Sequence, residues 1–192
     1  MSPTPVAALL VLVAVVASGC GAAVESEEGA TLTVYVSAPL SGKKAQEGRA
    51  AVRGAKGALA RADGRAGPWR LRAVYMDDTG GGETWTLAQV GANARRASED
   101  SAAIAYVGDL DPRATRFSLP ITSEAELLRI GYRPDEGVVP AAYGREAVKL
   151  LIAAIREAGG EGADRAAVAE AAADLIVRDG EPPGLTVELP GG

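Results

Sequence analysis

The sequence predicts an α/β protein with three layers, in which a parallel sheet is covered by helices on both faces. Apolar runs rich in β-branched residues alternate along the chain with segments whose apolar residues recur at helical spacing. Each apolar run also ends at a cluster of turn-forming or acidic residues. This alternation is typical of parallel sheets with right-handed crossovers. With 192 residues, the chain has room for one domain or at most two small ones.

The first strand and the first helix follow each other closely. Residues 31–37 (TLTVYVS) predict a strand, and residues 44–62 carry apolar side chains at helical spacing. Three glycines, Gly48, Gly54 and Gly57, lie within that helix. Because glycine costs up to about 1 kcal/mol relative to alanine inside a helix, close packing against a sheet or a ligand would rationalise them.

Two further strands and one helix follow in the same order. Residues 69–76 (WRLRAVYM) predict a second strand, which stops at Asp77 and Asp78. Residues 84–98 predict a second helix. Residues 102–107 (AAIAYV) are apolar throughout, which is typical of a strand buried on both faces.

The rest of the chain continues the alternation and then becomes helical. Residues 112–128 predict a third helix that contains Pro120, and residues 129–132 predict the start of a fourth strand. Two amphipathic helices are predicted over residues 143–158 and, after Asp164 as the N-cap, over residues 165–176. The turn-rich residues 178–192 contain one short apolar alternation, which predicts either an edge strand or a frayed tail.

The N-terminus carries an uncharged apolar run over residues 6–17, followed by small residues and then Cys20. The run fits the apolar part of a signal peptide and is too short to cross a bilayer as a helix. Small residues directly before a cysteine resemble the bacterial lipobox. We therefore expect residues 1–19 to be a lipoprotein signal peptide, Cys20 to be the lipidated residue that anchors an extracytoplasmic protein to the membrane, and residues 20–30 to be a tether. A secretory signal with a free cysteine, or a buried apolar helix, would be the alternatives.

Composition excludes several classes of function. The chain has no histidine and one cysteine, so it cannot form a Ser-His-Asp triad, a Cys-His pair or a zinc site of the usual type. We therefore expect no enzyme, no cofactor and no metal. The acids at positions 77, 78, 109 and 111 suggest a calcium or magnesium site, but such acids are more typical of turns and caps. The net charge of -5, without a long basic run, argues against binding to nucleic acid.

Several short motifs occur in a shared order over about a hundred residues. They are VYVSAPLSG at 34–42, YMDD at 75–78, NAR at 93–95 and AYVG at 105–108, with PAAYG following at 140–144. Together they resemble the type 1 periplasmic solute-binding proteins of branched-chain amino acid ABC transporters, the leucine/isoleucine/valine-binding family. That resemblance implies a fold of two lobes that close on a solute. It also implies that residues 31–177 keep about one lobe, with the second lobe largely missing at a junction near residues 131–140.

The resemblance also implies where a solute would bind. In parallel sheets ligands lie at the carboxyl ends of the strands, and the family uses loops at that edge. The residues expected to bind a ligand are Ser41, Glu47, Asp109, Leu110, Asp111, Arg113 and Tyr132.

The charges of these residues leave the solute open. Asp109 and Asp111 would repel a carboxylate and Arg113 would offset them, so a cationic or polyol solute is an alternative to an amino acid. The expected function is solute binding for an ABC transporter, with its permease as a partner. The alternative is a single-lobe remnant that does not bind a solute and that contacts a partner protein or forms a homodimer through the old lobe interface.

Overall fold

The computed structural model describes residues 29–134 and 137–189. The expected signal peptide, Cys20 and most of the expected tether lie outside these residues. Within them the chain forms six strands, five α-helices and one 3-10 helix. In chain order these are β1 (Thr31–Ala38), α1 (Ala45–Arg61), β2 (Arg65–Ala66), β3 (Trp69–Asp77), α2 (Leu87–Glu99), β4 (Ala103–Val107), α3 (Pro112–Glu124), β5 (Leu128–Tyr132), α4 (Pro140–Ala158), η2 (Gly159–Glu161), α5 (Arg165–Asp179) and β6 (Leu185–Glu188). No helix in this described part is both long and apolar enough to cross a membrane.

The strands form one sheet in the order β2-β3-β1-β4-β5-β6. The four central strands are parallel, as the sequence predicts, and Val36 of β1 pairs with Tyr75 of β3 on one side and with Val107 of β4 on the other. The two edge strands, β2 and β6, are antiparallel to their neighbours. The four strands that the sequence predicts are thus parallel, and the two additional edge strands make the whole sheet mixed.

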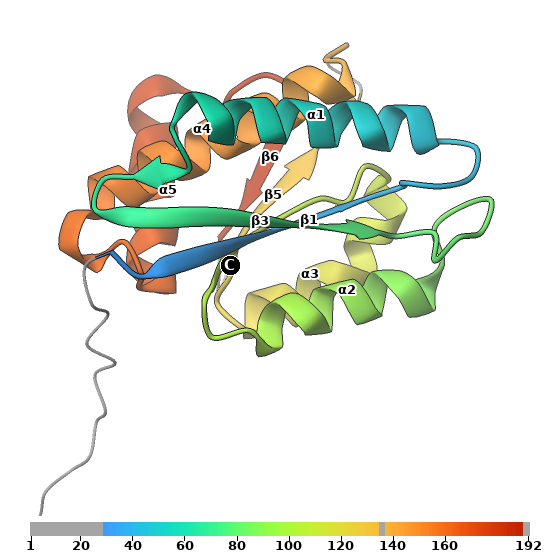
Figure 1. Cartoon of the computed structure of the whole chain (residues 1–192), viewed down its shortest axis with the longest axis horizontal. Coiled ribbons are helices and arrows are strands. Elements are labelled where there is room, and N and C mark those ends of the chain that lie inside the picture. The colour runs from blue at the N-terminus through green and yellow to red at the C-terminus, as the bar shows by residue number, and fades with distance from the viewer. Residues whose placement is uncertain (1–28, 135–136, 190–192) are drawn as a thin grey trace, which may run out of the picture.

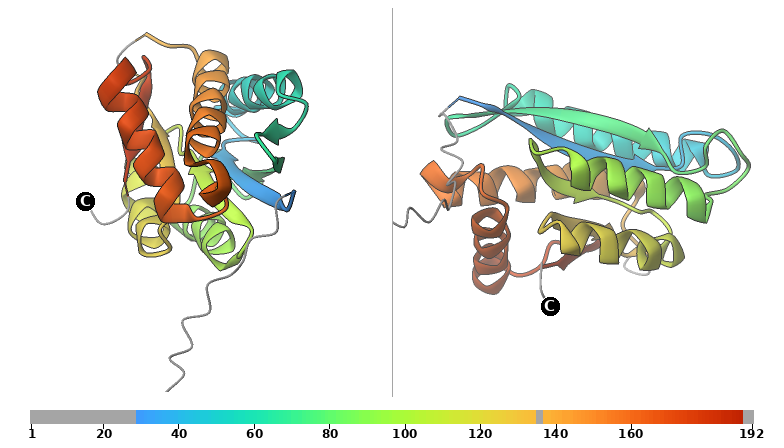
Figure 2. Two further views of the ribbon diagram at one scale, coloured as in Figure 1. Left: turned by 90° about the vertical axis from the view of Figure 1, so that its left-hand side faces the viewer. Right: turned by 90° about the horizontal axis from the view of Figure 1, so that it is seen from below.

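Helices cover both faces of the sheet, which confirms the three-layer α/β class (Figure 1). Helices α1 and α4 lie side by side on one face, and α5 packs against α4 in the same core cluster. Helices α2 and α3 lie side by side on the other face (Figure 2). The carboxyl ends of β1, β3, β4 and β5 therefore open between two helical layers, and we call this edge of the sheet the carboxyl edge.

The structure corrects the end of the third predicted helix and decides between the two alternatives for the C-terminal segment. Helix α3 ends at Glu124 rather than at residue 128, because Glu126 adopts a left-handed backbone with φ 57° and the buried Leu127 and Leu128 lead into β5. The apolar alternation near the C-terminus forms strand β6 and pairs with β5, so the edge-strand alternative is the one observed.

The helix glycines have a packing reason. A side chain on Gly54 would place its Cβ 2.0 Å from the carbonyl oxygen of Ala141, and one on Gly144 would place it 2.0 Å from that of Ala51. Helices α1 and α4 therefore approach each other more closely than any other residue type allows at these two positions. Gly54 serves a contact between helices, rather than the contact with a sheet or a ligand that the sequence suggested.

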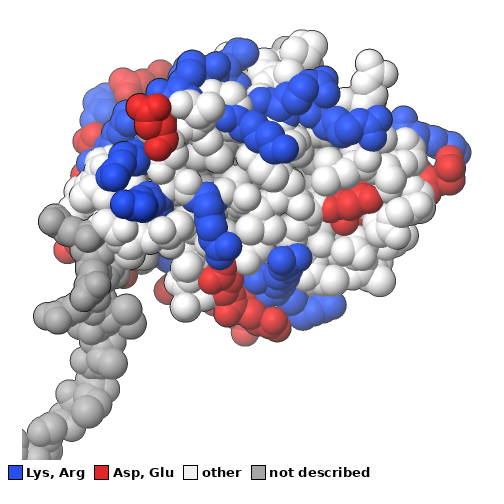
Figure 3. Space-filling view, in the orientation of Figure 1, with Lys and Arg blue, Asp and Glu red and all other residues white. Residues whose placement is uncertain are grey.

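One face of the molecule is basic although the net charge of the chain is negative. Lys and Arg side chains gather over α1 and the β2-β3 edge of the sheet (Figure 3). The exposed cations of these elements are Arg49, Arg53, Lys56, Arg61, Arg65, Arg70 and Arg72. They come from three elements, so the sequence alone, which contains no long basic run, did not indicate this face.

Candidate ligand-binding site

Two hollows lie next to each other at the carboxyl edge, and both are lined by Lys44, Leu110 and Asp111. The larger hollow, which we call the groove, has a volume of about 520 Å³ and is also lined by Glu47, Tyr132 and Val139. The smaller, which we call the Asp78 pocket, has a volume of about 380 Å³. Its further lining residues include Lys43, Asp78, Glu83, Trp85 and Arg113.

The fold brings most of the expected site residues to these hollows. Glu47, Leu110, Asp111 and Tyr132 line the groove, although they come from three segments far apart in the sequence. Arg113 lines the Asp78 pocket instead. The loops after β4 and β5 and the start of α1 thus meet, as parallel strands require when their carboxyl ends share one edge.

Ser41 lines neither hollow in the described structure, because it takes part in a turn. Its hydroxyl donates a hydrogen bond of 2.6 Å to Oδ2 of Asp77, and Asp77 also accepts hydrogen bonds from the backbone N–H groups of Leu40 and Thr79. Partial burial would raise the pKa of Asp77, but the hydrogen bonds from Ser41, Leu40 and Thr79 outweigh it and lower the pKa to about 2. Asp77 thus joins the loops after β1 and β3.

Asp111 is fully engaged by its neighbours. It caps α3 by accepting a hydrogen bond from the backbone N–H of Arg113. The Arg113 guanidinium donates to both oxygens of Asp111, at 3.0 and 2.7 Å, and Nε1 of Trp85 donates to Oδ2 at 2.9 Å. These hydrogen bonds, that of the Arg113 side chain first, hold the pKa of Asp111 well below its usual range. Its negative charge is therefore compensated in place.

Trp85 lines the site, although it is not among the site residues that the sequence predicts. Its ring lies 6.1 Å from that of Phe117, and the guanidinium of Arg113 lies 5.9 Å from its centroid. It forms part of the wall of the Asp78 pocket. Its position could have identified it, because Trp85 follows the turn after β3 and therefore lies at the same edge as the other loops.

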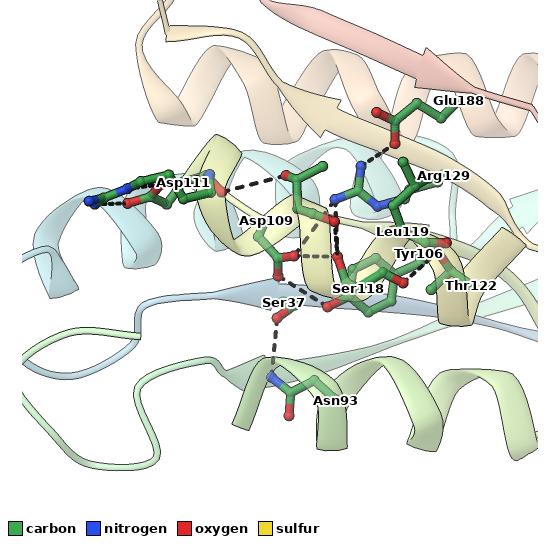
Figure 4. Close-up of polar contacts among 12 residues, drawn as sticks. Ser37, Asn93, Tyr106, Asp109, Asp111, Ser118, Leu119, Thr122, Arg129 and Glu188 are labelled. Carbon is green, nitrogen blue, oxygen red and sulfur yellow. Dashed lines mark hydrogen bonds and ion pairs between the residues drawn. The ribbon is translucent and has the colours of Figure 1, made fainter. Parts of the chain in front are cut away.

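Asp109 lies beneath the carboxyl edge rather than on it, which corrects the expectation of two exposed acids there. Its side chain is fully buried and 3.6 Å from Arg129, which is also fully buried (Figure 4). Asp109 accepts hydrogen bonds from the hydroxyl groups of Ser118, at 2.6 Å, and Tyr106, at 3.1 Å. With Asp109 paired inside and Asp111 paired at the surface, the edge does not present the two free acids that would repel a carboxylate.

The buried network continues to the edge strand β6. Nη1 of Arg129 donates a hydrogen bond of 2.5 Å to Glu188, and Nη2 donates one of 3.3 Å to Ser118 (Figure 4). Arg129 therefore lies between two carboxylates, one from the loop after β4 and one from β6. Through Arg129, the ion pairs connect strand β6 to the loop after β4.

Tyr132 joins the two sides of the predicted junction. Its hydroxyl donates a hydrogen bond to the carbonyl oxygen of Val138, and its ring lies 5.0 Å from that of Tyr143. Tyr143 is buried in α4 and donates a hydrogen bond of 2.8 Å to the carbonyl oxygen of Ile130 in β5. The end of β5 and the start of α4 are thus packed together, and this packing forms one end of the groove.

Asp78 differs from the other acids because it is buried, makes no ion pair within the described residues and leaves one carboxylate oxygen without a hydrogen bond. It is 1% exposed, and its Oδ1 accepts no hydrogen bond within the described part of the chain. Burial, followed by the charges of Asp109, Asp77 and Asp111, raises the pKa of Asp78 to about 7. Among the described residues, no group of three or more Cys, Asp or Glu side chains is placed to hold a metal ion.

Known proteins resemble this chain only over part of its length. No protein-family model matches this chain, and no curated protein matches it. The solved structures that resemble it include the leucine-binding protein LivK from Thermotoga maritima, at 17% identity and a TM-score of 0.45 over 51% of this chain and 26% of that one. A putative branched-chain amino acid ABC transporter from Rhodospirillum rubrum matches at 22% identity and a TM-score of 0.47, over 55% of this chain and 30% of that one.

A third similar structure is the branched-chain amino acid transporter substrate-binding protein LivJ from Streptococcus pneumoniae in complex with isoleucine. It matches at 20% identity and a TM-score of 0.46, over 53% of this chain and 28% of that one. The chain thus spans between a quarter and about three tenths of the length of these proteins.

Proposed function

We propose that this chain is an extracytoplasmic solute-binding lipoprotein of the branched-chain amino acid ABC transporter type, and that its groove binds a small polar solute or an amino acid. The observation that carries this proposal is the meeting of Glu47, Leu110 and Tyr132 at the carboxyl edge, around a groove of about 520 Å³. A hollow of this size suits a small molecule. The compensated charge of Asp111 and the burial of Asp109 remove the strongest objection to a ligand that carries a carboxylate.

A thermal-shift screen against amino acids, polyamines, sugars and aromatic acids tests the groove. We expect one class to raise the melting temperature, because a ligand that binds only the native state stabilises it. The variants Glu47→Gln and Leu110→Ala are each expected to need about tenfold more ligand for the same rise in melting temperature. Glu170→Gln, an exposed change on α5, serves as the matched control and is expected to need the same ligand concentration as wild type.

The alternative function is contact with a partner protein or a second copy of the chain. Val139, 62% exposed at the edge of the groove, favours it. If none of the four classes of solute shifts the melting temperature and the purified protein is dimeric by light scattering, this alternative replaces solute binding.

We also propose that Cys20 carries the lipid that anchors the chain to the membrane, with the transporter permease as a partner. This proposal rests on the apolar run and the small residues before the cysteine. Metabolic labelling with a radioactive fatty acid is expected to mark the wild-type protein and not Cys20→Ser. Equal labelling of both proteins would contradict lipidation at this residue.

A further inference from the structure

The surface over α1 and the β2-β3 edge of the sheet concentrates positive charge (Figure 3). Residues 45–72, which run from the start of α1 to the outward arginines of β3, contain seven Lys and Arg and two Asp and Glu. The chain as a whole has a net charge of -5, so the remainder of the molecule is strongly acidic. We call the surface formed by these seven cations the basic face.

Three cations of the basic face form a stripe along α1. Arg49, Arg53 and Lys56 are four and three residues apart, so their side chains leave the same side of the helix. Like charges at this spacing repel each other. No acid lies three or four residues from any of these cations, so α1 itself does not compensate the stripe.

Two further cations face each other at the edge of the sheet. Arg65 of β2 is paired directly with Arg70 of β3 in the antiparallel ladder, and both residues are exposed. Like charges opposite each other on neighbouring strands are destabilising. Neither guanidinium group makes a hydrogen bond or ion pair within the described residues, so an anion from a partner would relieve the repulsion.

A cation-π contact joins the stripe on α1 to the sheet. Nζ of Lys56 lies 4.8 Å from the centroid of the Tyr75 ring in β3. Arg72, two residues after Arg70 on the same side of β3, lies 3.7 Å from Asp100 and is the one cation of the face with an ion pair in the described structure. The basic face thus spans helix and sheet, and the protein neutralises little of its charge.

The place where the first strand begins favours a membrane surface as the anionic partner. Thr31 at the start of β1 is paired with Arg70, which in turn is paired with Arg65. Thr31 follows Cys20 by eleven positions, and a segment of that length spans at most about 40 Å when fully extended. A lipid on Cys20 would therefore hold the basic face close to lipid headgroups. It would not bring the face closer to a nucleic acid or an acidic protein.

We propose that the basic face lies against the surface of a membrane that contains anionic lipids, with its cations contacting the phosphate groups of the headgroups. Each cation near such a surface strengthens binding by about fivefold, and salt weakens the attraction. A basic patch and a lipid anchor together hold a protein more firmly than either alone. The inference takes the position of the anchor from the lipidation proposed at Cys20, but the attraction itself requires no anchor and no solute in the groove.

Vesicle co-sedimentation tests the attraction, using the purified full chain with Cys20→Ser so that the proposed lipid cannot attach. Vesicles of phosphatidylcholine alone are compared with vesicles that also contain about 30% phosphatidylglycerol. The neutral vesicles report any binding by the apolar N-terminal residues. We expect at least about tenfold tighter binding to the anionic vesicles at about 0.1 M salt, and loss of this difference at about 0.5 M salt. Without a basic face, a chain with a net charge of -5 would be repelled by them.

Paired variants of this parent chain locate the attraction on the molecule. The double variant Arg65→Gln with Arg70→Gln is expected to bind the anionic vesicles at least about tenfold more weakly than the parent. Both positions are exposed and the change removes a repulsive pair, so we expect the variant to fold. Arg116→Gln with Arg178→Gln removes the same charge from exposed positions on α3 and α5, and is expected to change binding by less than about twofold.

Three results would overturn the proposal. Equal binding to the two kinds of vesicle would show no attraction to anionic lipid, and equal losses by the two double variants would show that the attraction does not come from the basic face. Half-maximal binding to a DNA duplex at a lower phosphate concentration than to the anionic vesicles would assign the face to nucleic acid instead. None of these results bears on the groove or on lipidation, which the thermal-shift screen and the fatty acid labelling report separately.

Discussion

Replacing Asp78 with asparagine is expected to stabilise the protein strongly at about pH 8 and by less than about 1 kcal/mol at about pH 4. The pKa of Asp78 is raised from 3.8 to about 7, mainly by burial. Between these two values the native state holds a proton that the unfolded state releases, so the free energy of unfolding falls as the pH rises. The penalty is complete above about pH 7 and amounts to about 4 kcal/mol, since each pKa unit corresponds to about 1.4 kcal/mol.

Urea unfolding of both proteins at several pH values measures this difference. Glu83→Gln is the matched control, because Glu83 lies on the same pocket but is exposed. The control is expected to differ from wild type by less than about 0.5 kcal/mol at each pH. A difference between Asp78→Asn and wild type that does not grow with pH would show that burial does not raise the pKa of Asp78.

Replacing Arg129 with methionine is expected to reduce the free energy of unfolding by about 3 to 5 kcal/mol at neutral pH. The substitution removes the cation between Asp109 and Glu188. Asp109 would then be fully buried with only the hydroxyl groups of Ser118 and Tyr106 as partners. A buried charge without its counter-ion is much less stable than either a complete pair or a neutral pair of similar shape.

The double variant with Arg129→Met and Asp109→Asn tests the reason for this loss. It is expected to recover at least about 1 kcal/mol relative to Arg129→Met alone, because the neutral amide removes the uncompensated charge. Glu188→Gln is expected to lose less than Arg129→Met, since Glu188 is 27% exposed and can be hydrated. Should Arg129→Met lose less than about 1 kcal/mol, the buried network is not a major source of stability.

The central fold was predictable because the parallel strands and their helices have strong periodic patterns. Strand β4 is apolar at every position and is buried throughout, and Asp164 caps α5 by accepting a hydrogen bond from the backbone N–H of Ala167, as the sequence indicates. The two antiparallel edge strands were harder to predict. Strand β2 has two residues, and β6 depends on pairing with a strand more than fifty positions away.

The location of the site was predictable, but the state of its charges was not. Parallel topology places the loops of Glu47, Leu110 and Tyr132 at one edge, and they do line one groove. Asp109 and Asp78 look alike in the sequence, since each follows a strand at the carboxyl edge. Only the structure shows that Arg129 pairs with Asp109, whereas one buried oxygen of Asp78 accepts no hydrogen bond within the described residues. Their difference depends on long-range packing, which no local pattern reports.

The central claim is that a small solute binds at the carboxyl edge, and nuclear magnetic resonance of the isotope-labelled protein tests it most directly. Adding the solute class that the thermal-shift screen identifies is expected to shift the backbone amide signals of Glu47, Leu110 and Tyr132, which line the groove. Signals from α5, such as that of Glu170, should stay in place because α5 does not line the groove. Shifts confined to α5, or no shifts at saturating solute, would contradict solute binding at this edge.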